Sequence, residues 1–471
     1  MSHKYNYTIV YLHMTLIKSI SGIRGTLGGE EDKNLTPIDV VKYVSSYGKK
    51  LKKDSRNPKV AVGRDGRISG IQIIELVKST LSMLGITVYD IDLTTTPTTQ
   101  LFIIEHNLDG GIILTASHNP GNWNALKLFN SNGEFLSKSD GEEVINNSNN
   151  LGNCFVNEVD LGQIIKFENS FDIHIKNVLN LKHVNVDGIY KKKFKVVVDG
   201  INSSGGIIIP ELLKKLNCEV VKINCNPNGD FSHNPEPLDK NLTDLKNTVI
   251  KEKADLGIAV DPDVDRLVFV CEDGVLFGEE NTLVACSDFV LSKEKGSTVS
   301  NMSSTLGLKD VTERYGCEYF SSKVGEVNVV EMMKAKKAII GGEGNGGVIY
   351  PESHYGRDAL VGIVLFLSYL VEKNQKVSMI LNSMPSYFML KEKISLDENV
   401  DIDSIFSGIM STYNEKELDT RDGIKINKKS GWIHLRKSNT EPIIRIYIEA
   451  KNKEESEMFF SEIKKIIDTN S

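Results

Sequence analysis

The feature that most constrains the fold is an alternation of short apolar segments with segments of helical spacing. Residues 58–63, 86–93 and 110–115 have the apolar or alternating character of β-strands. Residues 70–84 and 100–105 between them have helical spacing, and an earlier helix is expected to begin at Pro37 with Thr36 as its N-cap. Strands that alternate with helices predict a mostly parallel sheet that helices cover on both faces.

The same alternation returns twice, which indicates two further α/β units. Strands at 194–198, 219–223 and 256–260 and a helix at 203–216 form the second unit. Helices at 281–291, 306–315 and 358–372 and a strand at 338–340 form the third. The chain from Tyr387 onward instead combines several strands with helices at 403–413 and 453–467, which is typical of a small α+β module.

Chain length sets the number of domains. The 471 residues exceed the ~250 at which a single hydrophobic core stops growing, so we expect several domains. We place four, at residues 14–165, 166–275, 276–383 and 384–471. Residues 1–13 are left out of the fold because Met14 resembles a natural start. Asn- and Ser-rich stretches at 146–153 and the polar stretch 373–376 are predicted to be linkers.

Charge and cysteine content exclude several classes of protein. The 56 basic and 63 acidic residues give a net charge of -7, so the chain lacks the basic surface of a nucleic-acid-binding protein. Its most apolar stretch, residues 360–371, is shorter than the ~20 residues of a membrane span. The six cysteines include no C-x-x-C pair, so we expect reduced thiols, no zinc site and a cytoplasmic location.

Ser117 follows the predicted strand at 110–115, within the segment Thr-Ala-Ser-His-Asn-Pro at residues 115–120. Ligands gather at the carboxyl ends of parallel strands, so Ser117 is well placed for a nucleophile. A serine hydroxyl needs a base to activate it, or must already carry a reactive group, and His118 is its sequence neighbour. A turn stabilised by Ser and Asn hydrogen bonds is the alternative.

Three aspartates, Asp261, Asp263 and Asp265, alternate after the predicted strand at 256–260. Such carboxylates stay ionised together only beside a cation, and several hard oxygen ligands favour Mg²⁺. An EF-hand is excluded because its sixth position requires Gly where this chain has Arg266, and because strands flank the segment. A solvated acidic turn is the alternative, although apolar strands on both sides disfavour it.

Residues 342–347, Gly-Glu-Gly-Asn-Gly-Gly, match the G-x-G-x-x-G pattern of dinucleotide-binding sites. A dinucleotide site should open directly into a helix, but residues 348–351 intervene, and Glu343 would place a carboxylate where pyrophosphate must approach. Glu343 and Asn345 in a glycine-rich loop suit sugar hydroxyls better. The alternative is a tight turn that carries two polar residues.

Several arginine-containing loops favour phosphate binding. Residues 436–442, Arg-Lys-Ser-Asn-Thr-Glu-Pro, and Arg445 beyond them provide cationic and hydroxyl donors that match phosphate oxygens. Arg24, Arg64 and Arg67 lie in shorter loops of the same kind. An exposed basic turn is the alternative reading of each.

Together and in this order, these loops resemble those of the α-D-phosphohexomutase family, enzymes that interconvert the 1- and 6-phosphates of hexoses and hexosamines. The resemblance extends from about Met14 to the end of the chain. It implies three related mixed α/β domains and a smaller C-terminal α+β domain around a central cleft. It also implies a sugar-phosphate substrate and a bisphosphorylated intermediate.

The resemblance assigns a role to each residue of the motifs. Ser117 would carry the phosphoryl group and would hold Mg²⁺ together with Asp261, Asp263 and Asp265. His118 and Lys127 would assist proton transfer, with Arg24 as a further catalytic cation. The substrate would be bound by Arg266, Glu343, Asn345, Arg436, Ser438, Asn439 and Thr440.

One position departs from the family pattern. Many members end the glycine-rich loop in Ser-Gly-His, whereas residues 345–347 are Asn-Gly-Gly, and His354 is the nearest histidine that could replace the missing one. Residues 15–22 and 343–347 resemble bacterial and archaeal phosphoglucosamine mutases, which implies conversion of glucosamine 6-phosphate to glucosamine 1-phosphate. Phosphomannomutase or phosphoglucomutase activity is the alternative, followed by a serine phosphatase and a non-catalytic sugar-phosphate sensor.

Overall fold

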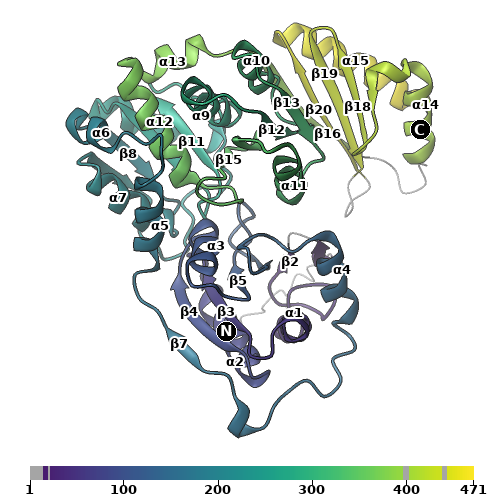
Figure 1. Ribbon diagram of the computed structural model, residues 1–471. Helices are drawn as coiled ribbons and strands as arrows, with labels where there is room; N and C mark the ends of the chain where they lie inside the picture. The colour runs from purple at the N-terminus through teal and green to yellow at the C-terminus, as the bar shows by residue number, and fades with distance from the viewer. Residues whose placement is uncertain (1–13, 20–21, 396–401, 438–442, 471) are drawn as a thin grey trace, which may run out of the picture.

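The computed structural model describes residues 14–19, 22–395, 402–437 and 443–470, which form four sheets flanked by helices (Figure 1). Domain I lies at the bottom of the view, domains II and III lie side by side above it, and domain IV lies to the right of domain III. No helix among the described residues is both long enough and apolar enough to span a membrane.

Domain I is built on a seven-stranded mixed sheet in the order β1-β2-β6-β5-β3-β4-β7. Its strands are β1 (Ile17–Ser19), β2 (Gly22–Thr26), β3 (Lys59–Arg64), β4 (Thr87–Leu93), β5 (Gly110–Leu114), β6 (Trp123–Phe129) and β7 (Ile164–Lys166). Its helices are α1 (Pro37–Asp54), α2 (Gly70–Met83), α3 (Thr96–Glu105) and α4 (Lys138–Asn147). The proposed boundary at residue 165 falls within β7, which pairs with β4 of this sheet.

Helix α1 begins where the sequence predicts. Pro37 is its first residue, and the Thr36 hydroxyl accepts the backbone N–H of Asp39 in a capping box. The parallel strands β3, β4 and β5 were also expected, whereas β6 runs antiparallel to β5 and makes the sheet mixed.

Domains II and III each contain a four-stranded sheet with one antiparallel pair at an edge. Domain II has strands β8 (Lys195–Asp199), β9 (Glu219–Ile223), β10 (Leu256–Val260) and β11 (Leu267–Cys271), and helices α5 (Ser170–Leu179), α6 (Val186–Lys192), α7 (Gly205–Lys215) and α8 (Thr243–Glu252). Domain III has strands β12 (Thr298–Asn301), β13 (Tyr319–Ser322), β14 (Ile340–Glu343) and β15 (Gly347–Ile349), and helices α9 (Glu279–Lys293), α10 (Gly307–Arg314), α11 (Glu326–Lys336), α12 (Ala359–Lys373) and α13 (Val377–Ser383).

The cores of domains II and III are continuous. One cluster of buried apolar side chains runs from the strands of domain II through α9 and α12 of domain III, and α12 is buried along most of its length. The linker predicted at residues 373–376 is therefore wrong, because this stretch is the short turn between α12 and α13 of one domain.

Domain IV is a smaller α+β unit. Its antiparallel sheet has the order β16-β20-β19-β18-β17, with strands β16 (Phe388–Ser395), β17 (Leu418–Asp419), β18 (Ile424–Lys428), β19 (Gly431–Lys437) and β20 (Ile443–Ala450). Helices α14 (Ile402–Thr412) and α15 (Lys453–Asn470) share a separate apolar core with this sheet. Three α/β domains and a smaller α+β domain are the architecture that the sequence predicts.

Candidate active site

In three domains the predicted polar loop connects a pair of antiparallel strands. The serine loop (residues 115–122) joins the antiparallel strands β5 and β6, the aspartate loop (residues 261–266) joins β10 and β11, and the glycine-rich loop (residues 342–347) joins β14 and β15. Residues from all three loops and from β20 of domain IV line one cavity of about 310 Å³. This volume lies within the range of small-molecule sites.

Ser117 is buried at the start of the serine loop and has a left-handed backbone, with φ 48°. A non-glycine residue in this region is strained, so the surrounding contacts must hold it there. Its backbone N–H donates to Thr115 Oγ1 at 3.0 Å, and its hydroxyl donates to Asp261 Oδ2 at 2.6 Å. Residues that lie 144 positions apart in the chain therefore meet at hydrogen-bond distance.

Arg67 supports the serine loop through hydrogen bonds to backbone carbonyl oxygens. Its Nη2 donates to the carbonyl oxygens of Ser117 and Asn119, each at 2.6 Å. Its Nη1 donates to the carbonyl oxygens of Pro120 at 2.6 Å and Trp123 at 3.0 Å. Its Nε pairs with Asp65 at 3.1 Å, and both side chains are fully buried. Arg67 therefore supports the loop and does not line the cavity, contrary to the phosphate-binding expectation.

Arg64, the other arginine of this segment, also points to a protein partner. Its Nε donates to Asp92 Oδ1 at 2.7 Å, and it is not among the residues that line the cavity. The sequence motif thus contains two structural arginines. In contrast, Arg24 lines the cavity as expected, and its Nη1 donates to Asn119 Oδ1 at 3.3 Å.

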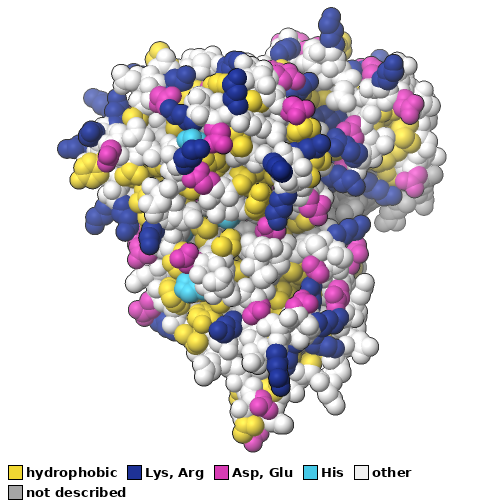
Figure 2. Space-filling model, viewed as in Figure 1, with side chains coloured by type: hydrophobic (Ala, Val, Ile, Leu, Met, Phe, Trp, Pro, Cys, Tyr) yellow, Lys and Arg dark blue, Asp and Glu magenta, His cyan; other side chains and the backbone are white. Residues whose placement is uncertain are grey.

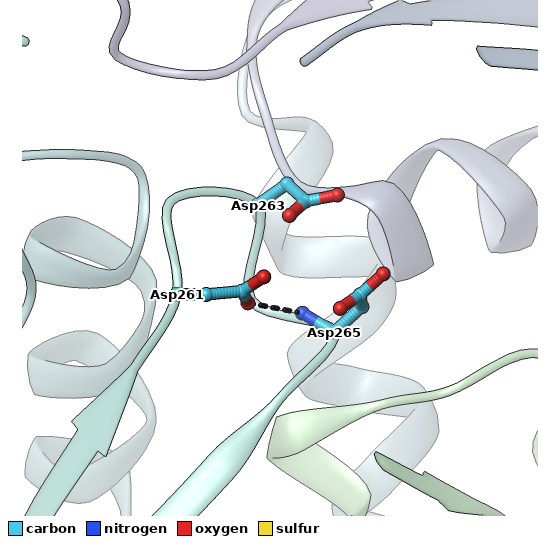
Figure 3. Close-up of side chains that lie close together, drawn as sticks. All are labelled: Asp261, Asp263 and Asp265. Atoms are coloured by element: carbon cyan, nitrogen blue, oxygen red, sulfur yellow. Dashed lines mark hydrogen bonds between the residues drawn. The ribbon is translucent and has the colours of Figure 1, made fainter. Parts of the chain in front are cut away.

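The three aspartates lie on one short loop with their carboxylates turned toward one another (Figure 3). All three are fully buried, and one ligand oxygen of each lies within 4.8 Å of the others. Asp261 Oδ1 accepts the backbone N–H groups of Asp265 at 3.2 Å and Arg266 at 3.1 Å, which fixes the turn. Val264 has φ 63°, a conformation that costs a β-branched residue free energy.

Each aspartate has one oxygen that contacts other parts of the protein. Asp263 Oδ2 accepts Lys127 Nζ at 2.6 Å and the Thr96 hydroxyl, while Asp265 Oδ2 accepts Arg357 Nη2 at 2.8 Å. Asp263 Oδ1 and Asp265 Oδ1 are buried and have no hydrogen-bond partner in the described parts of the chain. A buried anionic oxygen without a partner is costly, so this donor set fits a hard divalent cation.

Lys127 and His118, which line the cavity together with Ser117, differ in charge. Burial lowers the pKa of Lys127, but attraction to Asp263 and Asp265 outweighs burial, so the pKa is raised and the side chain stays an ammonium. Burial, together with nearby Arg266 and Arg24, lowers the pKa of His118 to about 2, so its imidazole is neutral. His118 Nδ1 lies 3.5 Å from Ser117 Oγ.

Cations from three domains face the cavity. Arg24, Arg266 and Arg445 all line it, and the pKa of Arg24 is lowered by burial and by the other two arginines. Arg445 lies directly opposite Arg436 in the β19–β20 register. Arg436, which was expected to bind the substrate, does not line the cavity, and its Nε lies 3.2 Å from Asp422 Oδ2. Figure 2 shows Lys and Arg side chains along the edge of domain IV that faces domain I. Ser438, Asn439 and Thr440 lie outside the described residues.

The glycine-rich loop is the tip of a β-hairpin, which agrees with the exclusion of a dinucleotide site. Glu343 Oε1 accepts Asn301 Nδ2 at 2.8 Å and the backbone N–H of Gly325 at 3.1 Å. Asn345 Nδ2 donates to Glu343 Oε2 at 3.4 Å, while Asn345 Oδ1 is buried without a partner among the described residues. The glycines are required here, because a Cβ at Gly346, where φ is 88°, would lie 2.4 Å from Leu267 O.

A chain of hydrogen bonds connects this loop to domain IV. His434 Nδ1 lies 2.8 Å from Ser303 Oγ, and the Ser303 backbone N–H donates to Asn301 Oδ1 at 2.9 Å. Asn301 in turn donates to Glu343. The position of domain IV and the position of Glu343 are therefore linked through β12 and the residues that follow it.

Two buried charged residues of the cavity wall were not predicted from the sequence. Arg357 and Glu326 line the cavity and pair with each other, Nε to Oε2, at 2.9 Å. Neither belongs to a recognisable motif, although Arg357 directly precedes Asp358, whose side chain caps α12. His354 does not line the cavity: it is buried and lies 3.2 Å from Asp358 Oδ2. It therefore does not replace the missing histidine of the loop.

Family models and relatives match almost the entire chain. The models for phosphoglucomutase/phosphomannomutase alpha/beta/alpha domains I, II and III match residues 16–153, 172–274 and 279–388, and the model for the C-terminal domain matches residues 392–466. A phosphoglucomutase/phosphomannomutase of Thermococcus kodakarensis is 34% identical over 442 residues, covering 92% of this chain and 95% of its own length.

Two further comparisons agree. A phosphoglucosamine/phosphogalactosamine mutase of Sulfurisphaera tokodaii is 31% identical over 95% of this chain and 98% of its own. The crystal structure of a phosphoglucomutase/phosphomannomutase family protein of Burkholderia thailandensis shares the fold with a TM-score of 0.81 at 22% identity, covering 97% of this chain and 98% of that one. With all four domains matched in order, the chain belongs to the phosphoglucomutase/phosphomannomutase family and is a phosphohexomutase.

Proposed function

We propose that the protein is a phosphoglucosamine mutase that moves a phosphoryl group between the 6- and 1-positions of glucosamine through a phosphoserine at Ser117. The observation that supports this most is the 2.6 Å hydrogen bond from Ser117 Oγ to Asp261, inside the group of three buried aspartates. We propose Mg²⁺ as the cation, held by Ser117, Asp261, Asp263 and Asp265. Mg²⁺ would neutralise charge on the phosphoryl oxygens during transfer.

The transfer exchanges one oxygen–phosphorus bond for another. A sugar hydroxyl attacks the phosphorus of phosphorylated Ser117, a new sugar–phosphate bond forms, and the bond to Ser117 Oγ breaks. On the basis of the family resemblance, His118 and Lys127 are proposed to assist the two proton transfers; His118 Nδ1 lies 3.5 Å from Ser117 Oγ, and Lys127 Nζ lies 2.6 Å from Asp263 Oδ2. Such proton transfers contribute about 10²–10⁴-fold, while positioning and charge stabilisation supply most of the remainder.

The sugar bisphosphate must then turn around so that its other phosphate returns to Ser117. Whichever phosphate is not reacting needs a cationic site that accepts either end of the sugar. Arg445, which lines the cavity together with Ser117, is suited to this, and Arg436 is its cross-strand neighbour on domain IV. Ser438, Asn439 and Thr440 are proposed to complete this site on the basis of the family resemblance. Arg24 and Arg266 are proposed to assist nearer the serine.

The wall of the cavity on domain III supports an amino sugar as substrate. Glu326, Glu343 and Asn345 line this wall. Asn345 Oδ1 is an acceptor without a partner among the described residues, and it lies beside the Glu343 carboxylate, which Asn301 and Arg357 orient. An ammonium group at C2 of the sugar supplies donors that a hydroxyl cannot match in number or charge. Phosphomannomutase or phosphoglucomutase activity is the second candidate, supported by the name of the Thermococcus kodakarensis relative.

Turnover on three substrates tests the sugar preference. We expect kcat/KM for glucosamine 6-phosphate to exceed the values for mannose 6-phosphate and glucose 6-phosphate at least tenfold. Equal values on all three would contradict the narrow assignment and leave a broad phosphohexomutase. Release of inorganic phosphate in step with substrate loss, without isomerised product, would instead identify a serine phosphatase.

Ser117→Ala tests the phosphoryl carrier. We expect the variant to lose isomerisation while it retains affinity for the sugar phosphate, because the cavity walls remain. Intact-mass measurement should show a phosphorylated fraction in the wild type and none in the variant. Near-normal turnover of Ser117→Ala would exclude the phosphoserine route.

A further inference from the structure

Arg357 contacts three carboxylates, more than any other described side chain that lines the cavity. Each of its three guanidinium nitrogens faces a different carboxylate: Nη2 lies 2.8 Å from Asp265 Oδ2, Nη1 lies 2.9 Å from Glu343 Oε2, and Nε lies 2.9 Å from Glu326 Oε2. These partners come from the aspartate loop, the glycine-rich loop and the first turn of α11. One buried arginine thus touches the group that fits a metal and the residue proposed to bind the sugar.

The backbone and the stem of Arg357 are fixed. Arg357 forms an antiparallel bridge with Ile349, and the next backbone N–H, from Asp358, donates to Val348 O at 2.8 Å. The stem lies against Gly347, where an added Cβ would be only 2.3 Å from Arg357 Cδ. Gly347 is the position at which many family members have the loop histidine. Here the arginine stem occupies the space that such a side chain would need.

The contacts of Arg357 orient both loops. Arg357 binds one oxygen of Asp265 and leaves Oδ1, which has no other partner in the described part of the chain, available to a cation. It also binds Glu343 Oε2, while Asn301 and Gly325 bind the other oxygen. A planar guanidinium holds several carboxylates at fixed relative positions, which the single nitrogen of a lysine cannot do.

We propose that Arg357 is a positioning residue that joins the aspartate loop to the glycine-rich loop, so that the metal ligands and the sugar-binding carboxylate share one support. The part of the proposal that concerns sugar binding rests on the proposed function. The part that concerns metal binding can be tested without measuring turnover. It also explains why the loop needs no histidine: an arginine stays charged in proteins, so this position orients groups and transfers no proton. Proton transfer then falls to residues of domain I.

Arg357→Lys tests the proposal because it keeps the positive charge and removes the planar guanidinium that holds three carboxylates. We expect the dissociation constant for Mn²⁺, measured by electron paramagnetic resonance without sugar, to rise about 10–100-fold, as is typical when a residue that orients metal ligands is changed. We expect a similar loss of affinity for glucosamine 6-phosphate in titration calorimetry. Asn301→Ala is the matched control: it removes a different partner of Glu343 and should weaken sugar binding alone.

A second variant covers the case in which Arg357→Lys does not fold. Gly347→Ala displaces the Arg357 stem while the guanidinium remains, and it should reproduce the joint loss of Mn²⁺ and sugar affinity. Either variant with both affinities unchanged, or with only one reduced, would overturn the proposal, as would an Asn301→Ala protein that loses both. If the wild type had no phosphoglucosamine mutase activity but the variants lost Mn²⁺ and sugar affinity as expected, the proposed function would be refuted. The positioning role of Arg357 would still be supported.

Discussion

Arg67 offers a sharp test of how the reactive serine is held. Arg67→Lys keeps the buried positive charge beside Asp65 but changes the number of donors. The arginine makes five hydrogen bonds: three to carbonyl oxygens of the serine loop, one to the carbonyl oxygen of Trp123 at the start of β6, and one to Asp65. A lysine ammonium has only three N–H groups, so at least two bonds are lost.

The expected loss in the free energy of unfolding follows from the number of hydrogen bonds lost. Two hydrogen bonds to a charged group, at about 1.5–3 kcal/mol each, amount to about 3–6 kcal/mol. This is a large part of the ~5–15 kcal/mol by which domains are stable. Because the lost bonds hold Ser117 in its left-handed conformation, the phosphorylated fraction of the protein should also fall.

Urea unfolding and intact mass measure the two effects. Arg64→Lys is the control, since Arg64 pairs through Nε with Asp92, whose side chain is half-exposed, and its loss should cost less than about 1 kcal/mol. If Arg67→Lys unfolded at the same urea concentration as Arg64→Lys and kept its phosphorylated fraction, the proposed role of Arg67 would be refuted.

Three further results are expected. Gly346→Ala should raise KM at least tenfold without reducing phosphorylation of Ser117, because its Cβ would meet Leu267 O at 2.4 Å and displace the loop; an unchanged KM would contradict this. Burial lowers the pKa of His434 to about 4, below the ~6.5 of a free histidine, so the unfolded chain takes up the proton first. Stability should therefore fall as the pH drops from about 6.5 towards 4, and denaturation of His434→Gln should show a shallower decline. Mg²⁺ should raise the Tm by relieving repulsion among the buried aspartates, with Asp263→Asn as the variant in which this shift is reduced.

The parts of the fold set by local pattern could be predicted from the sequence. Pro37 after Thr36 marks the start of α1, and the apolar run at 110–115 marks β5 and places Ser117 at a strand end. Strand β12 was missed because Thr298–Asn301 is short and three of its four residues are polar, and α11 was missed because its apolar residues form no clear stripe. These two elements are buried mainly against each other and against the rest of the domain III sheet, which the local sequence pattern does not report.

The site was predictable only where a motif is contiguous. The three aspartates occupy alternate positions of one short loop, which alone brings their carboxylates close together. The contacts of Arg357 with Asp265 and of Lys127 with Asp263 join residues 92 and 136 positions apart. No periodicity or spacing reports such pairs, because they depend on how separate domains pack. The same holds for Arg67, whose motif indicates a cation but not the direction in which it points.

The phosphoryl carrier, the ion site and the sugar-binding residues each lie on a separate hairpin of the same kind. Each hairpin is framed by its own sheet, so a loop can change sequence without altering the strands that support the other two. Substitutions of Asn345, which donates to Glu343 and is not among the described partners of the three aspartates, could redirect the choice of sugar while the phosphoryl carrier and the ion site keep their geometry. Such an arrangement lets one scaffold acquire new substrates through changes at a few positions of a single repeat.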